Sequence, residues 1–360
     1  MKRVLIICNT YYQLIVAIKI KETILENASV TLILSDHSNG AKQVSSRLKK
    51  LNFFDEVFFV ENKGIIEKRT YKERIDDFFS ISFGSNNRYG YYIKDVKNTY
   101  FEEIISFNYN IDIYGLYSIL SKKNKYIKYS QLEEGILSYR SVEDTRSRKI
   151  IRLIWRIVNR PVISDNYGNF YCFYPEVYKG ELNKIKLLPI SNQDVIIPIL
   201  RKIFDVENIC SYKEKYIFFT SVYDFEGGEP VGEYDLVCKV AKLVGKDNLL
   251  IKTHPRDTRT IYKDNGFKVD RNSSIPWEVI QLSGDFSDKV FMTINSGSVL
   301  SGSTMSEKPN RIYFMYKLCD IRGNFSCQRN AHDMENILSK QSMKSVLKTV
   351  KIAERLEDVI

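Results

Sequence analysis

The feature that most constrains the fold is an alternation of short apolar runs with amphipathic segments, in two separate parts of the chain. In the first part, runs such as Val4–Cys8 and Ser29–Leu34 predict buried strands, and Tyr11–Leu25 has helical spacing. The alternation resumes later, with a predicted strand at Tyr216–Thr220 and a helix at Tyr234–Val244. Strands that alternate with helices predict parallel sheets covered by helices on both faces.

The pattern therefore predicts the α/β class, with two Rossmann-like domains. We expect an N-terminal domain over residues 1–185 and a C-terminal domain over residues 186–360 that ends in closing helices. Asp165–Leu188, which is aromatic and punctuated by proline, is expected to be an interdomain segment. Helical patterns from Met334 and over Met343–Leu356 are expected to close the chain, after a last strand at Arg311–Met315.

The composition predicts a soluble globular protein with an anionic partner. Of the 360 residues, 44% are hydrophobic and 27% charged, and the formal net charge is +10. Such an excess favours phosphate-bearing substrates, a membrane surface or nucleic acid. Six scattered cysteines without C-x-x-C spacing fit a reducing cytoplasm better than a zinc site or a disulfide scaffold. No apolar stretch approaches the roughly 20 residues that cross a bilayer.

A strand that ends in basic residues and a histidine is the first candidate for a functional site. The apolar run Leu249–Ile251 is followed by Lys252, His254, Pro255 and Arg256. Ligands of open α/β sheets bind beyond the carboxyl ends of strands, so His254 is expected to face a cleft. The positive charges suit a phosphate that leaves during a reaction. A histidine that only hydrogen-bonds the backbone is the plainer alternative.

A second strand end offers a cradle for an anion. The predicted strand Val290–Ile294 leads into amide, hydroxyl and glycine residues at the start of a predicted helix: Asn295, Ser296, Gly297, Ser298, Ser301 and Ser303. Free backbone N–H groups and the positive end of a helix favour negative charge at such a place. A serine-rich helix cap without a ligand is the alternative.

Carboxylates follow two other predicted strands. Glu133 and Glu134 precede Gly135, and repulsion between the adjacent carboxylates is expected to raise one pKa and favour a general base. A solvated turn is the alternative for this Glu-Glu-Gly sequence. Asp224 and Glu226 lie in an acidic loop and offer either a mobile catalytic carboxylate or a helix cap.

The segment 146–160 predicts a basic amphipathic helix that carries Trp155. Such a helix fits an anionic membrane surface. It fits equally well a contact between domains, or between the subunits of a homodimer. Aromatic residues do not alternate with basic ones as they do in proteins that bind single strands, so no nucleic-acid partner is expected.

The phosphate-friendly elements lie in the second α/β block, and Glu133 and Glu134 lie in the first. Two Rossmann-like domains facing one cleft would form the GT-B arrangement of glycosyltransferases, with the acceptor on the N-terminal side. No Asp-x-Asp, the usual carboxylate pair for a divalent cation on a nucleotide sugar, occurs in the chain. Leaving-group charge is then expected to be neutralised by His254, Lys252 and the serine-rich helix start, without a metal.

These motifs resemble those of bacterial sialyltransferases: acid-acid-Gly after an N-terminal strand, Lys-x-His-Pro after a C-terminal strand, and a paired-serine region. The start CNTYYQ, with Asn9, Thr10 and Gln13, and the stretch KTHPRD from Lys252 most resemble glycosyltransferase family fifty-two. That family contains capsule and lipooligosaccharide α-2,3-sialyltransferases. The similarity covers most of the chain in order and spacing, through short motifs.

The resemblance implies an inverting, metal-independent transfer of sialic acid from CMP-sialic acid to a galactose-type hydroxyl of a surface glycan. It implies that His254 is a general acid, or stabilises charge, at the departing phosphate. The phosphate-binding serines would be among Ser296, Ser298, Ser301 and Ser303. The sugar-nucleotide site would also include Lys252, Pro255, Arg256, Asn295 and Gly297, and the cleft Asn9, Thr10 and Gln13.

The resemblance places the general base in one of two motifs. One is the acid-acid-Gly motif, with Glu133 and Glu134. The other is the loop that holds Asp224 and Glu226, which departs from the family's Thr-Gln-Pro form.

Two other functions fit the same residues. One is a transferase with another cytidine donor, CMP-Kdo or CDP-glycerol. The other is a non-catalytic peripheral membrane protein that uses the basic helix. In each case the expected location is the cytoplasm, with peripheral attachment to the inner face of the plasma membrane as an option, and no cofactor is expected.

Overall fold

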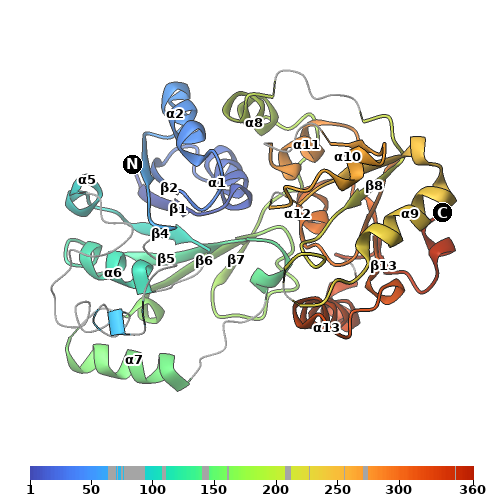
Figure 1. Ribbon diagram of the computed structural model, residues 1–360. Helices are drawn as coiled ribbons and strands as arrows, with labels where there is room; N and C mark the ends of the chain where they lie inside the picture. The colour runs from blue at the N-terminus through green and yellow to red at the C-terminus, as the bar shows by residue number, and fades with distance from the viewer. Residues whose placement is uncertain are drawn as a thin grey trace. The chain divides into compact units, whose positions relative to one another are not determined.

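The computed structural model describes residues 1–63, 70, 72–73, 76, 94–107, 111–139, 146–159, 162–206, 212–226, 228–254, 256–270, 275–344 and 346–360. The chain forms two compact units: Met1–Leu188 with Pro198–Ile203, and Pro189–Ile197 with Phe204–Ile360. Each unit is built around one parallel sheet flanked by helices (Figure 1). The predicted α/β class with two Rossmann-like domains is confirmed.

The sheet of the N-terminal unit has the strand order β3-β2-β1-β4-β5-β6-β7, and all neighbouring strands run parallel. Its strands are β1 (Arg3–Cys8), β2 (Ser29–Ser35), β3 (Glu56–Val60), β4 (Glu103–Ser106), β5 (Lys128–Leu132), β6 (Tyr167–Cys172) and β7 (Asn183–Lys186). The α-helices are α1 (Tyr11–Thr23), α2 (Ala41–Leu51), α5 (Lys94–Asn98), α6 (Ile111–Leu120) and α7 (Arg146–Ile157), and two 3-10 turns are η1 (Ile136–Tyr139) and η2 (Ile163–Asn166).

The sheet of the C-terminal unit has the order β10-β9-β8-β11-β12-β13, again all parallel. Its strands are β8 (Tyr216–Phe219), β9 (Leu249–Lys252), β10 (Lys268–Val269), β11 (Val290–Thr293), β12 (Arg311–Phe314) and β13 (Val350–Ile352). The α-helices are α9 (Glu233–Val244), α10 (Ile261–Asp264), α11 (Trp277–Ser283), α12 (Ser298–Met305) and α13 (Phe325–Ser339), while α8 (Ile196–Phe204) crosses the boundary between the units in sequence.

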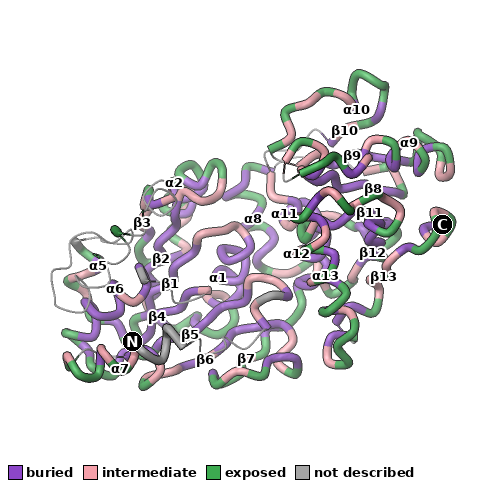
Figure 2. Tube along the Cα trace, turned by 60° about the horizontal axis from the view of Figure 1, so that its bottom comes forward, coloured by how far each residue is buried: buried purple, intermediate pink, exposed green. Residues whose placement is uncertain are grey.

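Both sheets share the Rossmann strand order, with the first strand at the centre. The second and third strands lie on one side of it, and the fourth and later strands lie on the other. Because helices cover both faces, the central strands are apolar throughout: in β1 every residue after Arg3 is buried, and all of β8 is buried (Figure 2). The order places a topological switch point between β1 and β4, and another between β8 and β11.

Two predictions about secondary structure are wrong. Asp165–Leu188 is not an interdomain segment, because it contains β6 and β7, which extend the N-terminal sheet. Met343–Leu356 is not a helix, because Val350 pairs with Ile312 and so adds β13 to the edge of the C-terminal sheet. In both places pairing with an existing strand overrides a local pattern.

Helix α7 packs through its tryptophan. Trp155 is 1% exposed and clusters with Ile119 and Val162. Its ring packs edge-on against the Tyr114 ring, with 4.5 Å between the ring centroids. The Trp155 ring therefore faces the interior of its own unit and is not exposed to a membrane surface. Residue 160, at the end of the predicted helix, lies outside the described residues.

Candidate active site

A cavity opens at the switch point of the C-terminal sheet. Its volume is about 370 Å³, which is within the range of small-molecule sites. The residues that line it follow the carboxyl ends of β8, β9 and β11 or belong to α13: Ser221, Val222, Tyr223, Glu226, His254, Arg256, Asn295, Ser296, Gly297, Ser326, Arg329 and Asn330. Parallel strands bring these loops to one edge of the sheet, so residues far apart in sequence share one cavity.

His254 reaches this cavity in a defined orientation. Its backbone N–H donates to Thr220 Oγ1 at 2.9 Å, which joins the loop after β9 to the end of β8. Its ring Nδ1 accepts the backbone N–H of Arg256 at 3.1 Å, so Nε2 is the nitrogen available to a ligand. Burial, and then the charge of Arg256, lowers the pKa of the imidazole below its ordinary value, so the ring is neutral at neutral pH.

The basic residues around His254 differ in their availability. Lys252 is buried and forms an ion pair with Asp270 at 3.0 Å, which neutralises its charge inside the unit. Arg256 lines the cavity and pairs with Glu226 at 2.6 Å. Pro255 lies outside the described residues. Of the predicted cations, only Arg256 faces the cavity.

The predicted anion cradle is divided between the cavity and the interior. Ser296 lines the cavity, and its hydroxyl shares a 2.8 Å hydrogen bond with that of Ser298. A Cβ added to Gly297 would meet no atom within 4 Å, so open space lies beside it. By contrast, the Ser303 hydroxyl accepts a 3.0 Å hydrogen bond from the buried Gln281 amide.

Two other residues of the predicted cradle form hydrogen bonds with α11 and α13. The Ser301 hydroxyl hydrogen-bonds Glu278, on the neighbouring helix α11. Asn295 is buried and lines the cavity, and its side-chain amide donates to the Cys327 carbonyl at 3.4 Å. Of the four predicted serines, two are therefore grouped at the start of α12 beside the cavity.

The first turns of α13 form a wall that was not predicted from the sequence. Ser326, Arg329 and Asn330 all line the cavity, and Arg329 has no ion pair among the described residues. The buried Asn324 caps this helix by accepting the Cys327 N–H at 3.0 Å, and its amide donates to the Tyr223 carbonyl at 3.1 Å. Asn324 therefore fixes the start of α13 against the loop after β8.

One feature of the sequence does indicate that a helix begins before Ser326, Arg329 and Asn330. Asn324 is a strong N-cap residue, but the helix was predicted to begin only at Met334, so the polar residues before it were not considered. The real helix begins nine residues earlier in the chain, at Phe325.

The acidic loop after β8 separates its two predicted carboxylates. Asp224 accepts the backbone N–H groups of Val231, Gly232 and Glu233, at 2.9 to 3.0 Å, and so holds the start of α9. Glu226 lines the cavity instead.

A carboxylate behind the cavity holds the same loop in place. Glu233 is fully buried and accepts the Ser221 N–H with both oxygens, at 2.8 and 3.0 Å. Burial raises the pKa of Glu233 to about 8.

In the N-terminal unit, Glu133 is a structural carboxylate. It is fully buried and accepts hydrogen bonds from the hydroxyls of Tyr12, at 2.7 Å, and Tyr139, and from the Phe173 N–H at 2.9 Å. Burial raises the pKa of Glu133 to about 7, partly offset by these hydrogen bonds. The cause is desolvation, and not the expected repulsion from Glu134.

Glu134 is less buried than Glu133 and is linked by hydrogen bonds to the predicted residues that follow β1. It accepts the Thr10 hydroxyl at 2.9 Å and also hydrogen-bonds the Gln13 side chain. Gln13 in turn accepts the Asn9 N–H at 2.7 Å. Burial raises the pKa of Glu134. Gly135, with a φ of 73°, allows the tight turn that follows.

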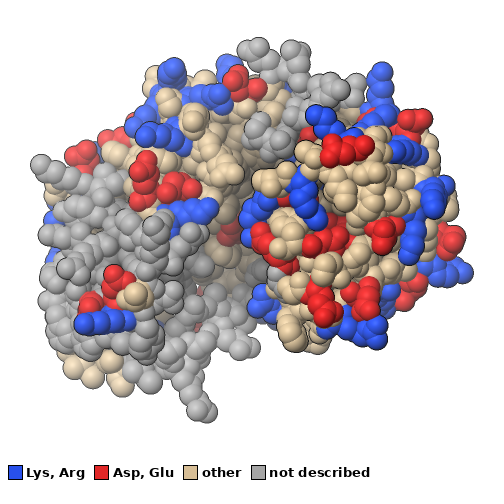
Figure 3. Space-filling view, in the orientation of Figure 1, with Lys and Arg blue, Asp and Glu red and all other residues tan. Residues whose placement is uncertain are grey.

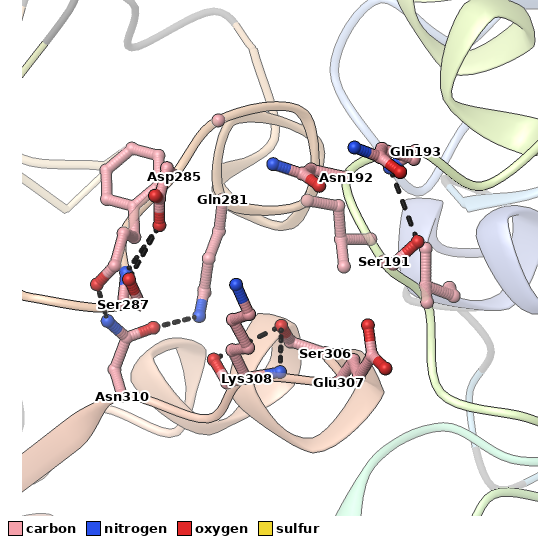
Figure 4. Close-up of a pocket in the computed structure, with 14 residues that line it drawn as sticks. Ser191, Asn192, Gln193, Gln281, Asp285, Ser287, Ser306, Glu307, Lys308 and Asn310 are labelled. Atoms are coloured by element: carbon pink, nitrogen blue, oxygen red, sulfur yellow. Dashed lines mark hydrogen bonds between the residues drawn. The ribbon is translucent and has the colours of Figure 1, made fainter.

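A second cavity of the C-terminal unit lies at the opposite end of β11 (Figure 4). It measures about 200 Å³, and its lining includes Ser287 and Asn310, which precede β11 and β12, and residues just beyond the ends of α11 and α12. The C-terminal end of a helix presents unpaired carbonyl groups and a partial negative charge, which disfavour the binding of a phosphate. None of the predicted site residues that the structure describes lines this cavity.

No protein-family model matches the chain, and no curated protein matches it. Solved structures align with most of the chain at low identity. UDP-N-acetylglucosamine 2-epimerase from Rickettsia bellii is 13% identical, with a TM-score of 0.45, over 87% of this chain and 78% of that one. Glycosyltransferase VinC in complex with dTDP is 10% identical, with a TM-score of 0.48, over 96% of this chain and 93% of that one.

The spinosyn rhamnosyltransferase SpnG, complexed with thymidine diphosphate, is 8% identical, with a TM-score of 0.45, over 100% of this chain and 90% of that one. The chemistry of the present chain therefore rests on its own residues. Within the described parts of the chain, no helix has both the length and the apolar character needed to span a bilayer.

Proposed function

We propose that this chain is an inverting glycosyltransferase that moves sialic acid from CMP-sialic acid to a galactose-type hydroxyl of a capsule or lipooligosaccharide glycan, without a metal ion or other cofactor. The observation that carries the proposal is the cavity shared by His254, Ser296 and Arg329. An imidazole, a serine at a helix start and a guanidinium are groups that stabilise an outgoing phosphate. The N-terminal unit, with Glu134, is proposed to hold the acceptor.

The departure of CMP is the step in which negative charge develops. The bond between the anomeric carbon of the sugar and the phosphate oxygen breaks, and both electrons stay with CMP. Ser296, Ser298 and the Nε2–H group of His254 are proposed to donate hydrogen bonds to the phosphate. Donors placed where charge forms contribute more to the rate than donors that bind the ground state equally well.

His254 is proposed to donate a hydrogen bond and not a proton. Because its Nδ1 accepts the Arg256 N–H, the proton of the neutral ring is on Nε2. The lowered pKa keeps the ring neutral at neutral pH. Loss of the Nε2 proton from a neutral ring would leave an imidazolate, a species too basic to form here. Of the two roles that the resemblance implies for His254, we therefore propose charge stabilisation.

The acceptor hydroxyl must lose its proton to a carboxylate as its oxygen attacks. Glu226 and Glu134 are the two candidates, because Glu226 lines the cavity and Glu134 is less buried than Glu133. Glu133 is fully buried, and Asp224 is held by the start of α9. Glu134→Gln and Glu226→Gln should be measured side by side. The variant that lacks the base is expected to transfer roughly a hundredfold more slowly or worse. If neither variant is slow, the assignment of a carboxylate base is wrong.

A pH profile separates the two candidates further. Burial raises the pKa of Glu134, so a reaction that needs its ionised form should decline as the pH falls through a value above 4.5. The Thr10 hydroxyl lowers this pKa, so Thr10→Val is expected to move the decline to higher pH. If Glu226 is the base, Thr10→Val should leave the profile unchanged.

The donor is tested by following nucleotide release from CMP-sialic acid, CMP-Kdo and CDP-glycerol in parallel. We expect release of CMP from CMP-sialic acid in the presence of a galactose-terminated acceptor. Release from only one of the other two would assign the chain to that donor. Release from none of them, together with no binding of CMP in calorimetry, would refute the proposed function.

We place the proposed enzyme in the cytoplasm, with peripheral attachment to the inner face of the plasma membrane. In the non-catalytic alternative, which uses the basic helix alone, Trp155 would not contact the membrane because it is buried. Its remaining support is the exposed part of α7.

A further inference from the structure

The outer side of α7 carries apolar residues that its packing does not use. Leu153 is 60% exposed and Ile157 is 74% exposed, and they lie one helical turn apart. The helix Arg146–Ile157 contains five basic residues and no acidic residue. An exposed aliphatic pair on a purely basic helix is unlike an ordinary solvated helix face, in which both signs of charge are interspersed.

The loop that joins α6 to β5 has the same character. Lys122, Lys123 and Lys125 are exposed, and Tyr126 is 70% exposed. The Lys125 ammonium group lies over the Tyr126 ring, 4.8 Å from its centre. A solvent-facing tyrosine among lysines combines an apolar body with a polar tip and positive charge.

Contacts within the unit join α7 and this loop. Ile119, near the end of α6, packs against Trp155 and Val162. Asn166, shortly after α7, donates hydrogen bonds to the Lys125 carbonyl, at 3.2 Å, and to the Tyr117 hydroxyl, at 3.1 Å. Neither 121–126 nor 146–159 contains an acidic residue. The nearby Asp165 is already paired with Arg156 at 2.6 Å.

We propose that the exposed side of α7 and the 122–126 loop together dock on an anionic phospholipid surface. Lys122, Lys123 and Lys125 would meet the lipid headgroups. Leu153, Ile157 and Tyr126 would enter the interface between headgroups and acyl chains. On the visible face of the C-terminal unit, basic and acidic side chains are mixed (Figure 3). A nucleic acid would match the lysines but would leave the exposed aliphatic pair without a function.

The charge requirement is tested with two matched pairs of adjacent lysines in the N-terminal unit. Lys122→Glu/Lys123→Glu reverses the proposed face, and Lys49→Glu/Lys50→Glu reverses two exposed lysines of α2. Cosedimentation is measured with vesicles of phosphatidylcholine alone and of an equal mixture with phosphatidylglycerol. We expect binding only to the mixed vesicles, and a loss of at least about tenfold in partitioning for the first pair alone.

The apolar requirement is tested in the same assay with two single variants. Ile157→Ser is expected to weaken partitioning several-fold, while Leu188→Ser, which removes a comparably exposed aliphatic side chain elsewhere, should not. Thermal unfolding of every variant checks that a loss of binding is not a loss of folding. A folded Ile157→Ser variant that binds as wild type would overturn the proposal.

Other outcomes would also overturn it. Equal losses in the two lysine pairs would mean a general charge effect, and no binding by the wild type would mean that no such face exists. Preferential binding of double-stranded DNA over mixed vesicles, in direct competition, would assign the face to nucleic acid. The outcome is independent of the proposed donor chemistry, because none of the variants touches the cavity of the C-terminal unit.

Discussion

At the switch point of the N-terminal sheet, between β1 and β4, the neighbouring loops supply carboxylates and the hydroxyls that bind them. Glu134 with Thr10, and Glu133 with Tyr12, fill this region with internal hydrogen bonds. At the corresponding point of the C-terminal sheet, between β8 and β11, the loops supply an imidazole, serines and a guanidinium around a cavity. The strand order is the same in both units over their first six strands.

The difference shows that strand order decides where a site lies and that the loops decide its chemistry. In both units, side chains from several strand ends meet at the carboxyl edge because parallel strands point in the same direction. Glu133 accepts hydrogen bonds within a buried network, whereas in His254 only Nδ1 accepts a hydrogen bond and Nε2 is available to a ligand. Catalysis of phosphate departure is therefore proposed for the C-terminal unit, and a positioning or base role for the N-terminal one.

The largest expected effect comes from removing the imidazole. His254→Ala should lower turnover by roughly two to four decades, because one donor to a developing charge contributes on that scale. His254→Gln, whose amide can still donate a hydrogen bond, should retain more activity than His254→Ala. The measurement is the rate of CMP release at saturating donor. Transfer near the wild-type rate by folded His254→Ala would remove the central assignment.

Glu133 is expected to affect stability and not turnover. Its pKa is raised from 4.5 to about 7 in the folded state, so its contribution is fully present below pH 4.5 and is lost as the pH rises towards 7. The shift corresponds to about 3 kcal/mol of unfolding free energy. Glu133→Gln should therefore show a shallower decline in stability over this range, measured by urea unfolding.

An exposed acid in the same unit is the control for Glu133. Glu181→Gln should leave the slope of stability against pH as in the wild type. An unchanged slope in Glu133→Gln would mean that this carboxyl is not the group that titrates.

Arg329 is expected to act on donor binding. Arg329 lines the cavity without an ion pair among the described residues. Arg329→Gln should therefore raise the KM for the donor by about ten- to a hundredfold, with a smaller effect on kcat. Arg322→Gln is the matched control, because Arg322 is exposed, paired with Asp320 and close in sequence. Equal kinetic effects of the two variants would show that the wall formed by α13 has no role in binding.

The smallest effects should separate two serines of one helix region. Ser296→Ala is expected to weaken donor binding about fivefold, the scale of one hydrogen bond. Ser303→Ala should leave binding unchanged and lower stability by about 1 kcal/mol, because its hydroxyl accepts from the buried Gln281. Calorimetry with CMP and thermal unfolding measure the two effects. A reversed pattern would move the anion site to the interior side of α12.

The sequence by itself determined the α/β class and most of the central strands, because buried parallel strands are continuous apolar runs that need no tertiary information to recognise. It also placed His254 and Ser296 after strand ends, where a ligand of such a sheet binds. The edge strand β13 was missed, since it exists only through pairing with β12.

Only the tertiary structure decided which of the predicted polar residues remain available to a ligand. Lys252, Asp224 and Ser303 look equivalent to Arg256, Glu226 and Ser296 in the sequence, yet the structure brings only Arg256, Glu226 and Ser296 to the cavity. Lys252, Asp224 and Ser303 have their partners elsewhere in the unit. Likewise Glu133 is fully buried, whereas the neighbouring Glu134 is less buried. The physical reason is that a residue at the cavity and a residue away from it can be of the same type and differ only in their neighbours from distant parts of the chain. Arg329 was missed because the helix was predicted to begin only at Met334, and because the fold brings the first turns of α13 to the cavity.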